Sequence, residues 1–385
     1  MPSCGAVSLY PKAAEKTQEA ALPEAEAASI QKTADGFVME NGLVSARING
    51  QGEVVSFRLK TGNGTADGLS REYAAGPMNR LRLFKDVPRK FDAWDIDSNY
   101  VCQEIEGACE VAVEPVEEGL EAVLKVTGRI SQSAYTQYIR LAADSRRLEF
   151  ETIIDWKELH RLLKTSFPVN VYAENGINEI QFGYVERPAH RSRPYDQERF
   201  EVCNHHYSAF RDANGGAAVL NDCKYGISMN ENSLELTLLR ASAAPEMRAD
   251  NKVHHFTYAF TAWEGSFMDS DVVRQGYELN VKPYLASGSG QDFSMLFIDR
   301  ANIILDTMKP AEDGSGDIIL RLYESKKAAT SASVQLSREL LTAGSSVYAC
   351  DMLENVTEEL SVLDGALALS FHPFEIRTIR IAGPR

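Results

Sequence analysis

A two-residue alternation of apolar and polar positions is the commonest pattern along this chain. Its clearest examples are the faces formed by Leu148, Phe150, Thr152 and Ile154, and by Phe256, Tyr258 and Phe260. Because successive side chains of a strand point to opposite faces, both patterns predict half-buried strands. Similar segments are separated by turn sequences at 49–52, 62–64 and 214–216. The sequence therefore predicts an antiparallel, all-β protein.

Helical signals are few, and two stretches are typical of linkers. The best helix candidate is 269–278, where Val272, Val273 and Tyr277 share a face behind a capping Asp or Ser. Residues 13–34 are rich in Ala and Glu, which favours a linker that is partly helical. We expect an opening strand and linker in 1–34, a large β domain in 35–285, the polar linker 286–291, and a smaller β domain in 292–385.

Composition excludes several classes of function. With 55 acidic and 40 basic residues, the net charge of −15 disfavours nucleic acid and anionic membrane surfaces as partners. No apolar run of about 18 residues and no secretion signal is present, so a cytoplasmic location is expected. The six cysteines form no C-x-x-C pair. We therefore expect reduced, mostly buried thiols rather than a disulfide framework.

Neither a metal site nor a nucleophile motif is predicted within this chain. Two adjacent histidine pairs, His205–His206 and His254–His255, lie in expected strands and would point to opposite faces. There is no H-E-x-x-H, G-x-S-x-G, Walker or Rossmann motif. No cofactor is therefore expected in this chain.

The stretch 84–100, "FKDVPRKFDAWDIDSNY", could contact a sugar. Asp92, Asp95 and Asp97 flank Trp94, and carboxylates beside an aromatic plane suit a pyranose, whose hydroxyls donate to the acids while its apolar face covers the ring. An irregular crossing between strands is the alternative, because Asp favours turns and the basic residues of the stretch could pair with these acids.

A second stretch, 186–207, mixes arginines with carboxylates. Its basic residues are Arg187, Arg191, Arg193 and Arg199, and its acidic neighbours include Asp196, Glu198 and Glu201. A guanidinium can hold a carboxylate in bidentate fashion. We interpret the stretch as a salt-bridge network that braces a long loop, in which Arg187, His190, Arg199 and Glu201 could support a cleft.

The order of the long motifs resembles the C-terminal β region of glycoside hydrolase family 38, the α-mannosidases, and most of all its bacterial and cytosolic branch. These motifs are 84–100, 187–207, "AAVLNDCKYGISM", "LELTLLRASAAPEMRADNKVHHFTYAF" and "SFMDSDVVRQGYELN". The opening "PSCGAVSLY" and the late "DIILRLYES" and "HPFEIRTIRI" extend the likeness over nearly the whole chain. Phe91 departs from the tryptophan that the family often carries before D-A-W-D.

This resemblance implies a β-supersandwich, similar to that of galactose mutarotases, followed by a smaller β-sandwich. It also implies retaining hydrolysis of α-mannosides in glycans by a zinc ion and an aspartate nucleophile on an N-terminal barrel, whose residues are not among those here. We therefore expect this chain alone to be inactive and to pack against its own barrel. By the same resemblance, Asp92, Trp94, Asp95 and Tyr100 would face the barrel at the edge of the substrate cleft.

Two other functions stay open at this point. The chain could be a free-standing carbohydrate-binding or scaffold module, which should bind glycans without a partner. It could also be a mutarotase-like enzyme, which would need a histidine facing a glutamate, for example His190 or His206 facing Glu201.

Overall fold

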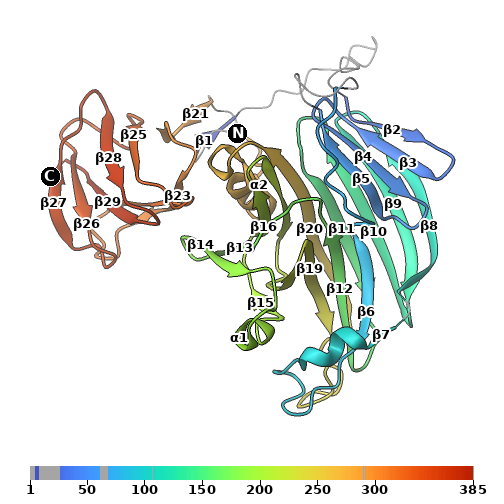
Figure 1. The fold of residues 1–385 in the computed structure, drawn as a ribbon. Coiled ribbons are helices and arrows are strands. Elements are labelled where there is room, and N and C mark those ends of the chain that lie inside the picture. The colour runs from blue at the N-terminus through green and yellow to red at the C-terminus, as the bar shows by residue number, and fades with distance from the viewer. Residues whose placement is uncertain are drawn as a thin grey trace, which may run out of the picture. The chain divides into compact units, whose positions relative to one another are not determined.

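The computed structural model describes residues 5–7, 27–60, 68–105, 107–288, 290 and 292–384, which form strands in several sheets (Figure 1). The described residues divide into two compact units. The larger unit takes residues from 18–179 and 185–282, and the smaller takes residues from 1–17, 180–184 and 283–385. The predicted linkers at 13–34 and 286–291 lie in part outside the described residues.

A nine-stranded antiparallel sheet forms one layer of the larger unit. Its order is β14 (Gly183–Pro188), β13 (Asn175–Ile180), β16 (Tyr207–Asp212), β17 (Gly215–Asn221), β20 (Val253–Glu264), β11 (Leu148–Asp155), β10 (Ser133–Ala142), β9 (Glu121–Ile130) and β8 (Ala108–Glu117). Within it, β10 and β11 show the regular alternation of buried and less buried positions that the sequence pattern predicts.

Two smaller sheets complete this unit. The six-stranded sheet has the order β15 (Val202–Cys203), β18 (Gly226–Asn230), β19 (Ser233–Arg240), β12 (Arg161–Pro168), β6 (Arg80–Lys85) and β7 (Glu104–Ile105). The four-stranded sheet has the order β2 (Ser29–Lys32), β3 (Gly36–Glu40), β4 (Val44–Asn49) and β5 (Val54–Leu59). The remaining elements are α1 (Pro194–Gln197) and α2 (Val272–Asn280), with 3-10 turns η2 (Ser98–Cys102) and η3 (Phe267–Asp269).

Aromatic rings join the three sheets into one core. Phe167 of β12 stacks on Phe260 of β20 with ring centroids 5.6 Å apart, and Phe57 of β5 meets the edge of Phe260 at 4.9 Å. All three rings are buried. Side chains of facing sheets therefore interdigitate as in a β-sandwich, which confirms the predicted all-β fold class.

The central strand β20 differs from its prediction. Leu148, Phe150, Thr152 and Ile154 are buried and alternate with half-buried neighbours, as predicted. In β20, however, both faces are buried from residue 256 to residue 263, so the prediction of a half-buried strand is wrong there. The strand lies at the centre of the sheet, beside β17, which helix α2 contacts. That helix begins three residues later than predicted.

Strand β8 is an irregular edge of the nine-stranded sheet. It pairs with β9 alone, and its register shifts twice, between Cys109 and Ala112 and between Pro115 and Glu117. Glu110, inside the first irregularity, adopts a φ of 51°. Most of its side chains are exposed. An edge strand with bulges and a proline is poorly suited to pairing with a further strand.

The smaller unit is a two-sheet sandwich with its own core. One sheet has the order β22 (Leu296–Ile298), β25 (Thr330–Leu336) and β28 (Ala366–Phe371), and the other has the order β23 (Ile303–Pro310), β24 (Ile318–Glu324), β29 (Ile376–Ala382), β26 (Ser346–Cys350) and β27 (Val356–Leu360). Leu320, Val334 and Ile379 are buried in its core. Strand β1 (Gly5–Ala6) pairs with β21 (Phe293–Ser294). The predicted smaller C-terminal sandwich is confirmed.

The cysteines do not lie where they were predicted. Cys102, Cys109, Cys203 and Cys223 are exposed and Cys350 is half-buried, all as free thiols, while Cys4 lies outside the described residues. The prediction of mostly buried thiols is wrong, because the four exposed cysteines occupy edge strands and connections, where one side meets solvent. Among the described residues, no helix is long and apolar enough to cross a membrane.

Candidate functional site

Residues 91–95, which we call the Trp94 turn, lie in the connection between β6 and η2. The N–H groups of Trp94 and Asp95 both donate to the carbonyl of Phe91, over 2.7 and 2.9 Å. Phe91 has a φ of 51°, in the left-handed region that bulky residues rarely adopt. Such a conformation persists only where surrounding contacts hold it.

Arg240, the last residue of β19, supplies those contacts. Its guanidinium donates to the backbone oxygens of Asp95, Asp92 and Ala93 over 2.6, 3.2 and 3.3 Å. It also pairs with the buried carboxylate of Asp86 at 2.7 Å. A planar group with several donors in fixed directions can bond several acceptors at once. One side chain thus fixes the path of the Trp94 turn.

Asp92 ties the turn to a second loop. Its Oδ2 accepts from the N–H groups of Ala243 and Ala244, over 2.7 and 3.0 Å, and contacts Nε2 of His160 at 3.1 Å. Burial disfavours the charged carboxylate, but these hydrogen bonds and His160 outweigh it and lower the pKa of Asp92. Asp92 is therefore a positioning residue within this chain.

Trp94 and Asp95 point the other way. The Trp94 side chain is 72% exposed, and Phe91 and Asp95 are exposed beside it. The turn thus presents a large aromatic side chain and a carboxylate to solvent, on a backbone held by Arg240 and Asp92. We call Phe91, Trp94 and Asp95 the Trp94 surface.

Tyr100 is buried and so does not belong to the Trp94 surface. Its ring packs edge-on against Phe84 at 5.2 Å and against Phe200 at 6.3 Å. Its hydroxyl donates to Glu201 over 3.1 Å and accepts from Nζ of Lys164 over 3.1 Å. Burial raises the pKa of Tyr100 to about 12, so the phenol keeps its proton at neutral pH. Tyr100 therefore anchors η2 to strands β6 and β12 in the interior.

The partner of Tyr100, Lys164, was not singled out from the sequence. It lies in β12, is fully buried, and contacts the carboxylate of Glu201, which also accepts from the Thr237 hydroxyl at 3.3 Å. Burial lowers the pKa of Lys164 to about 7. No signal in the sequence could have found it, because a lysine in an alternating strand is usually turned to solvent.

The remaining predicted residues brace the loop 186–207. Arg187 donates to Oδ1 of Asn178 over 2.6 Å and to the carbonyl of Cys203 over 3.0 Å. Arg193 forms a salt bridge with the buried Asp196 at 2.7 Å. Nδ1 of His190 lies 3.8 Å from the same carboxylate. Exposed Arg199 lies over the ring of Tyr195, 5.5 Å from its centroid. These contacts agree with a bracing network.

The histidine–glutamate pair required by a mutarotase-like enzyme is not formed at Glu201. His206 pairs with Glu179 at 3.1 Å, and this hydrogen bond raises the pKa of His206 against the opposing effect of burial. His205 and His206 also lie in a bend, not in a strand as predicted. There the chain crosses from β15 in one sheet to β16 in another, so it cannot continue a ladder.

Comparison with known families decides where the chain belongs. The model of the glycosyl hydrolases family 38 C-terminal domain matches residues 39–248, more than half of the chain. The chain belongs to glycoside hydrolase family 38. A second family 38 model, of the C-terminal beta sandwich domain, matches residues 302–379 in the smaller unit. The resemblance predicted from the sequence motifs is thus confirmed, and the Trp94 turn lies inside the first match.

Relatives within family 38 are much longer than this chain. It is 31% identical over 369 residues to alpha-mannosidase 2C1 of Homo sapiens, covering 93% of this chain and 35% of that protein. It is 32% identical over 365 residues to alpha-mannosidase G of Dictyostelium discoideum, covering 89% of this chain and 32% of that protein. The chain thus spans about a third of the length of these curated relatives.

A solved structure shows the same fold. The crystal structure of an alpha-mannosidase from Enterococcus faecalis V583 matches with a TM-score of 0.70 and 16% identity, over 89% of this chain and 42% of that one. At this identity the likeness concerns the fold alone.

The zinc that family resemblance implies has no fitting donors among the residues that the structure describes. They contain no group of three or more His, Cys, Asp or Glu side chains placed to hold a metal ion. His160 faces Asp92 and His206 faces Glu179, each as a pair. A zinc centre takes at least three protein ligands, so neither pair fits one.

Proposed function

We propose that this chain is the C-terminal β portion of a retaining, zinc-dependent α-mannosidase that hydrolyses α-mannosides in glycans. In this proposal the Trp94 surface packs against the N-terminal catalytic barrel and borders the substrate cleft. Zinc and the nucleophile belong to the barrel. This chain's role is to pack against the barrel and complete the edge of the substrate cleft. The support is family membership together with a length about a third of that of relatives named alpha-mannosidases.

The observation that carries the proposal is the exposure of Trp94 on a fixed backbone. Arg240 and Asp92 hold the turn from two sides, while the indole stays 72% exposed. Aromatic side chains dominate the energetics of protein contacts, and the indole N–H adds a directed donor. Of the four residues predicted at the cleft edge, the contact rests on Trp94 and Asp95, because Asp92 and Tyr100 use their polar atoms within the chain.

Alanine at Trp94 or Asp95 in the full-length enzyme tests this role. We expect kcat/KM for an aryl α-mannoside to fall about tenfold or more, since truncating a central aromatic contact commonly costs about 2 kcal/mol. The melting temperature should change little, because neither side chain belongs to the core. Tyr172→Ala is the matched control, as Tyr172 is an aromatic residue of the same unit with 83% exposure. Kinetics equal to those of the Tyr172 variant would refute the role.

A free-standing carbohydrate-binding module is the second candidate, because an exposed indole can also cover the apolar face of a sugar. Titration of mannose oligosaccharides into the 385-residue chain separates the two. Saturable binding that Trp94→Ala abolishes would favour the module. Binding that survives in Trp94→Ala, or no binding, would leave the barrel-contact proposal in place.

A further inference from the structure

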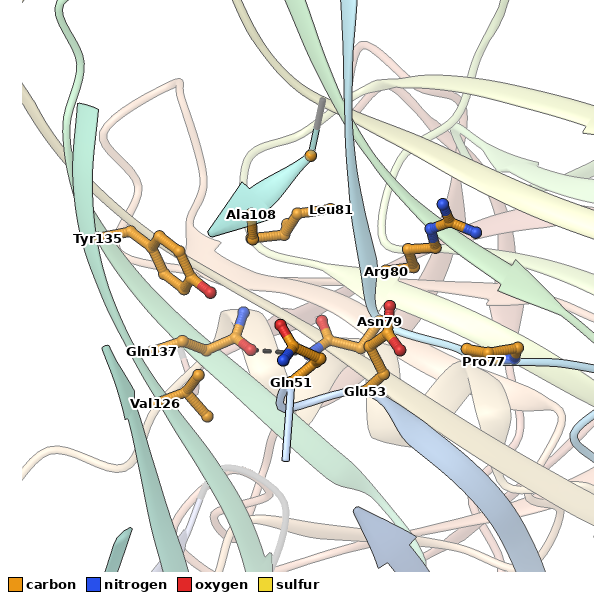
Figure 2. Close-up of a pocket in the computed structure, with 11 residues that line it drawn as sticks. Gln51, Glu53, Pro77, Asn79, Arg80, Leu81, Ala108, Val126, Tyr135 and Gln137 are labelled. Atoms are coloured by element: carbon orange, nitrogen blue, oxygen red, sulfur yellow. Dashed lines mark hydrogen bonds between the residues drawn. The ribbon is translucent and has the colours of Figure 1, made fainter. Parts of the chain in front are cut away.

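A polar pocket lies where the three sheets of the larger unit meet, formed by residues other than the Trp94 surface. Its cavity volume is about 350 Å³. Exposed Gln51, Pro77 and Arg80 form its rim, while Asn79 and Gln137 belong to its buried floor. The lining comes from the turn before β5, the start of β6, and strands β8, β9 and β10 (Figure 2). A pocket open at the rim and closed at the floor can admit a small molecule.

The floor is a preorganised polar network. Asn79 Nδ2 donates to Oε1 of Gln137 over 2.7 Å and to the carbonyl of Gly52 over 3.0 Å. Its Oδ1 accepts from the hydroxyl of Tyr258 over 2.6 Å, and Gln137 Nε2 also donates to that hydroxyl at 2.9 Å. Asn79 has a φ of 59°, a strained conformation that these bonds hold. The amides therefore keep fixed positions at the base of the pocket.

Tyr135 brings a hydroxyl without a protein partner to the same space. The residue is only 5% exposed, yet its hydroxyl makes no hydrogen bond to any residue that the structure describes. The ring lies over Gly128, where a Cβ would come within 2.9 Å of the hydroxyl oxygen. Figure 2 shows the phenol pointing from β10 toward the labelled side chains of the pocket. The hydroxyl is not one of the fully buried polar atoms that lack a partner, so it opens into the pocket, where water or a ligand can bond it.

Glu53 adds an acceptor at the half-buried wall. Its Oε2 accepts from Nδ2 of Asn49 over 2.9 Å, and Oε1 has no partner among the described residues. Burial raises the pKa of Tyr135, so this phenol is a donor at neutral pH. Among the lining residues that the structure describes, Glu53 and Arg80 are charged, one of each sign. The described lining thus offers a donor and acceptors, and its two charges balance.

We propose that this pocket binds an uncharged polyhydroxylated ligand of hexose size, with the Tyr135 hydroxyl and the Glu53 carboxylate as its hydrogen-bonding anchors. About 350 Å³ lies at the lower end of the range of small-molecule sites, which suits a single sugar ring rather than an oligosaccharide. Alternating donors and acceptors match vicinal hydroxyls. The site is independent of the proposed enzymatic role, since none of its residues belongs to the Trp94 surface.

Titration of D-mannose, D-galactose and D-glucose into the 385-residue chain, followed by ligand-detected NMR, tests the site. We expect saturable binding of at least one hexose with a dissociation constant on the order of millimolar, as befits so small a ligand. Tyr135→Phe should weaken it about fivefold and Glu53→Gln by a similar factor, the effect of losing one hydrogen bond. Tyr135→Phe should unfold at the same temperature as the wild type, because its hydroxyl bonds no described residue.

Trp94→Ala distinguishes this site from the Trp94 surface. It should leave hexose binding in the pocket unchanged, whichever role the Trp94 surface has. Absence of saturable binding by all three hexoses would overturn the proposal and leave a water-filled pocket. Binding that Trp94→Ala abolishes, or that Tyr135→Phe and Glu53→Gln both leave intact, would overturn it as well.

Discussion

At the scale of single residues, Arg240 explains why the Trp94 turn keeps one conformation. The guanidinium donates to three backbone carbonyls of the turn and pairs with the carboxylate of Asp86. Trp94 itself could be singled out from the D-A-W-D stretch, but Arg240 could not. It lies 145 residues beyond Asp95, and nothing in the sequence signals a contact between a strand end and a turn so far apart.

Lys164 gives a residue-scale prediction. Burial lowers its pKa from 10.5 to about 7. Between these values the unfolded chain binds a proton that the folded chain lacks, so Lys164 makes the free energy of unfolding rise with pH. Lys164→Met removes this contribution. We therefore expect the wild type to gain stability relative to the variant as pH increases from about 7 to about 10.

Urea unfolding of both proteins across this range measures the difference. The variant loses a partner of Glu201 and starts from a lower stability, so the slope with pH, rather than the level, is the readout. Lys157→Met, at an exposed lysine, should keep the wild-type slope. Parallel profiles for the wild type and Lys164→Met would show that Lys164 keeps its proton throughout.

At the scale of elements, alternation predicts strands well but not what covers them. The face of Leu148, Phe150 and Ile154 is buried as predicted, because β11 carries half-buried side chains on its other face. In β20 the second face is also buried, and in β12 Lys164 lies inside a run that is buried on both faces. Burial of the outer face depends on neighbouring layers, about which a period of two carries no information.

The pocket, too, could not be predicted from the pattern along single strands, because several elements form it together. Glu53 directly precedes β5, Asn79 directly precedes β6 and Tyr135 lies in β10, so only the packing of three sheets brings these residues together. Gly128 is the sequence feature that matters most there. It lies opposite Tyr135 in the pairing of β9 with β10, which leaves room for the phenol ring.

Gly128→Ala tests this packing. The added Cβ would lie 2.8 to 2.9 Å from three atoms of the Tyr135 ring system, so the ring must move. We expect the free energy of unfolding to fall by about 1–3 kcal/mol, the usual cost of overpacking. Urea denaturation measures it. Gly50→Ala is the control, because no heavy atom lies within 4 Å of its added Cβ. Equal stability of the two variants would contradict the close packing.

At the scale of the whole molecule, the sequence motifs predicted the fold class because long, ordered stretches match one family. The two units have separate hydrophobic cores, one around Phe150 and Tyr258 and the other around Leu320 and Ile379. The two family 38 models match most of each core, although Tyr258 and the rest of β20 lie beyond the end of the first match. The function of the whole protein is harder to predict from this sequence, because the proposed zinc and nucleophile belong to the barrel.

The proposal predicts that the 385-residue chain alone does not hydrolyse an aryl α-mannoside, with or without added zinc. The longer protein should do so, and a chelator should abolish its activity, because zinc polarises bonds and organises the substrate at such sites. Release of the chromogenic phenol at matched concentrations is the measurement. Turnover by the 385-residue chain above the blank would place catalytic residues within it. It would contradict the proposal that catalysis belongs to the barrel alone.

The broken register of β8 has a consequence for the protein's behaviour in a crowded solution. Nine strands side by side expose, at a sheet edge, hydrogen-bonding groups that a strand from another molecule could extend into an ordered aggregate. Here two bulges, Pro115 and a series of acidic side chains interrupt that template. The largest sheet therefore ends in a strand that resists fibril growth, and straightening β8 by deleting its bulges should make the protein aggregate more readily.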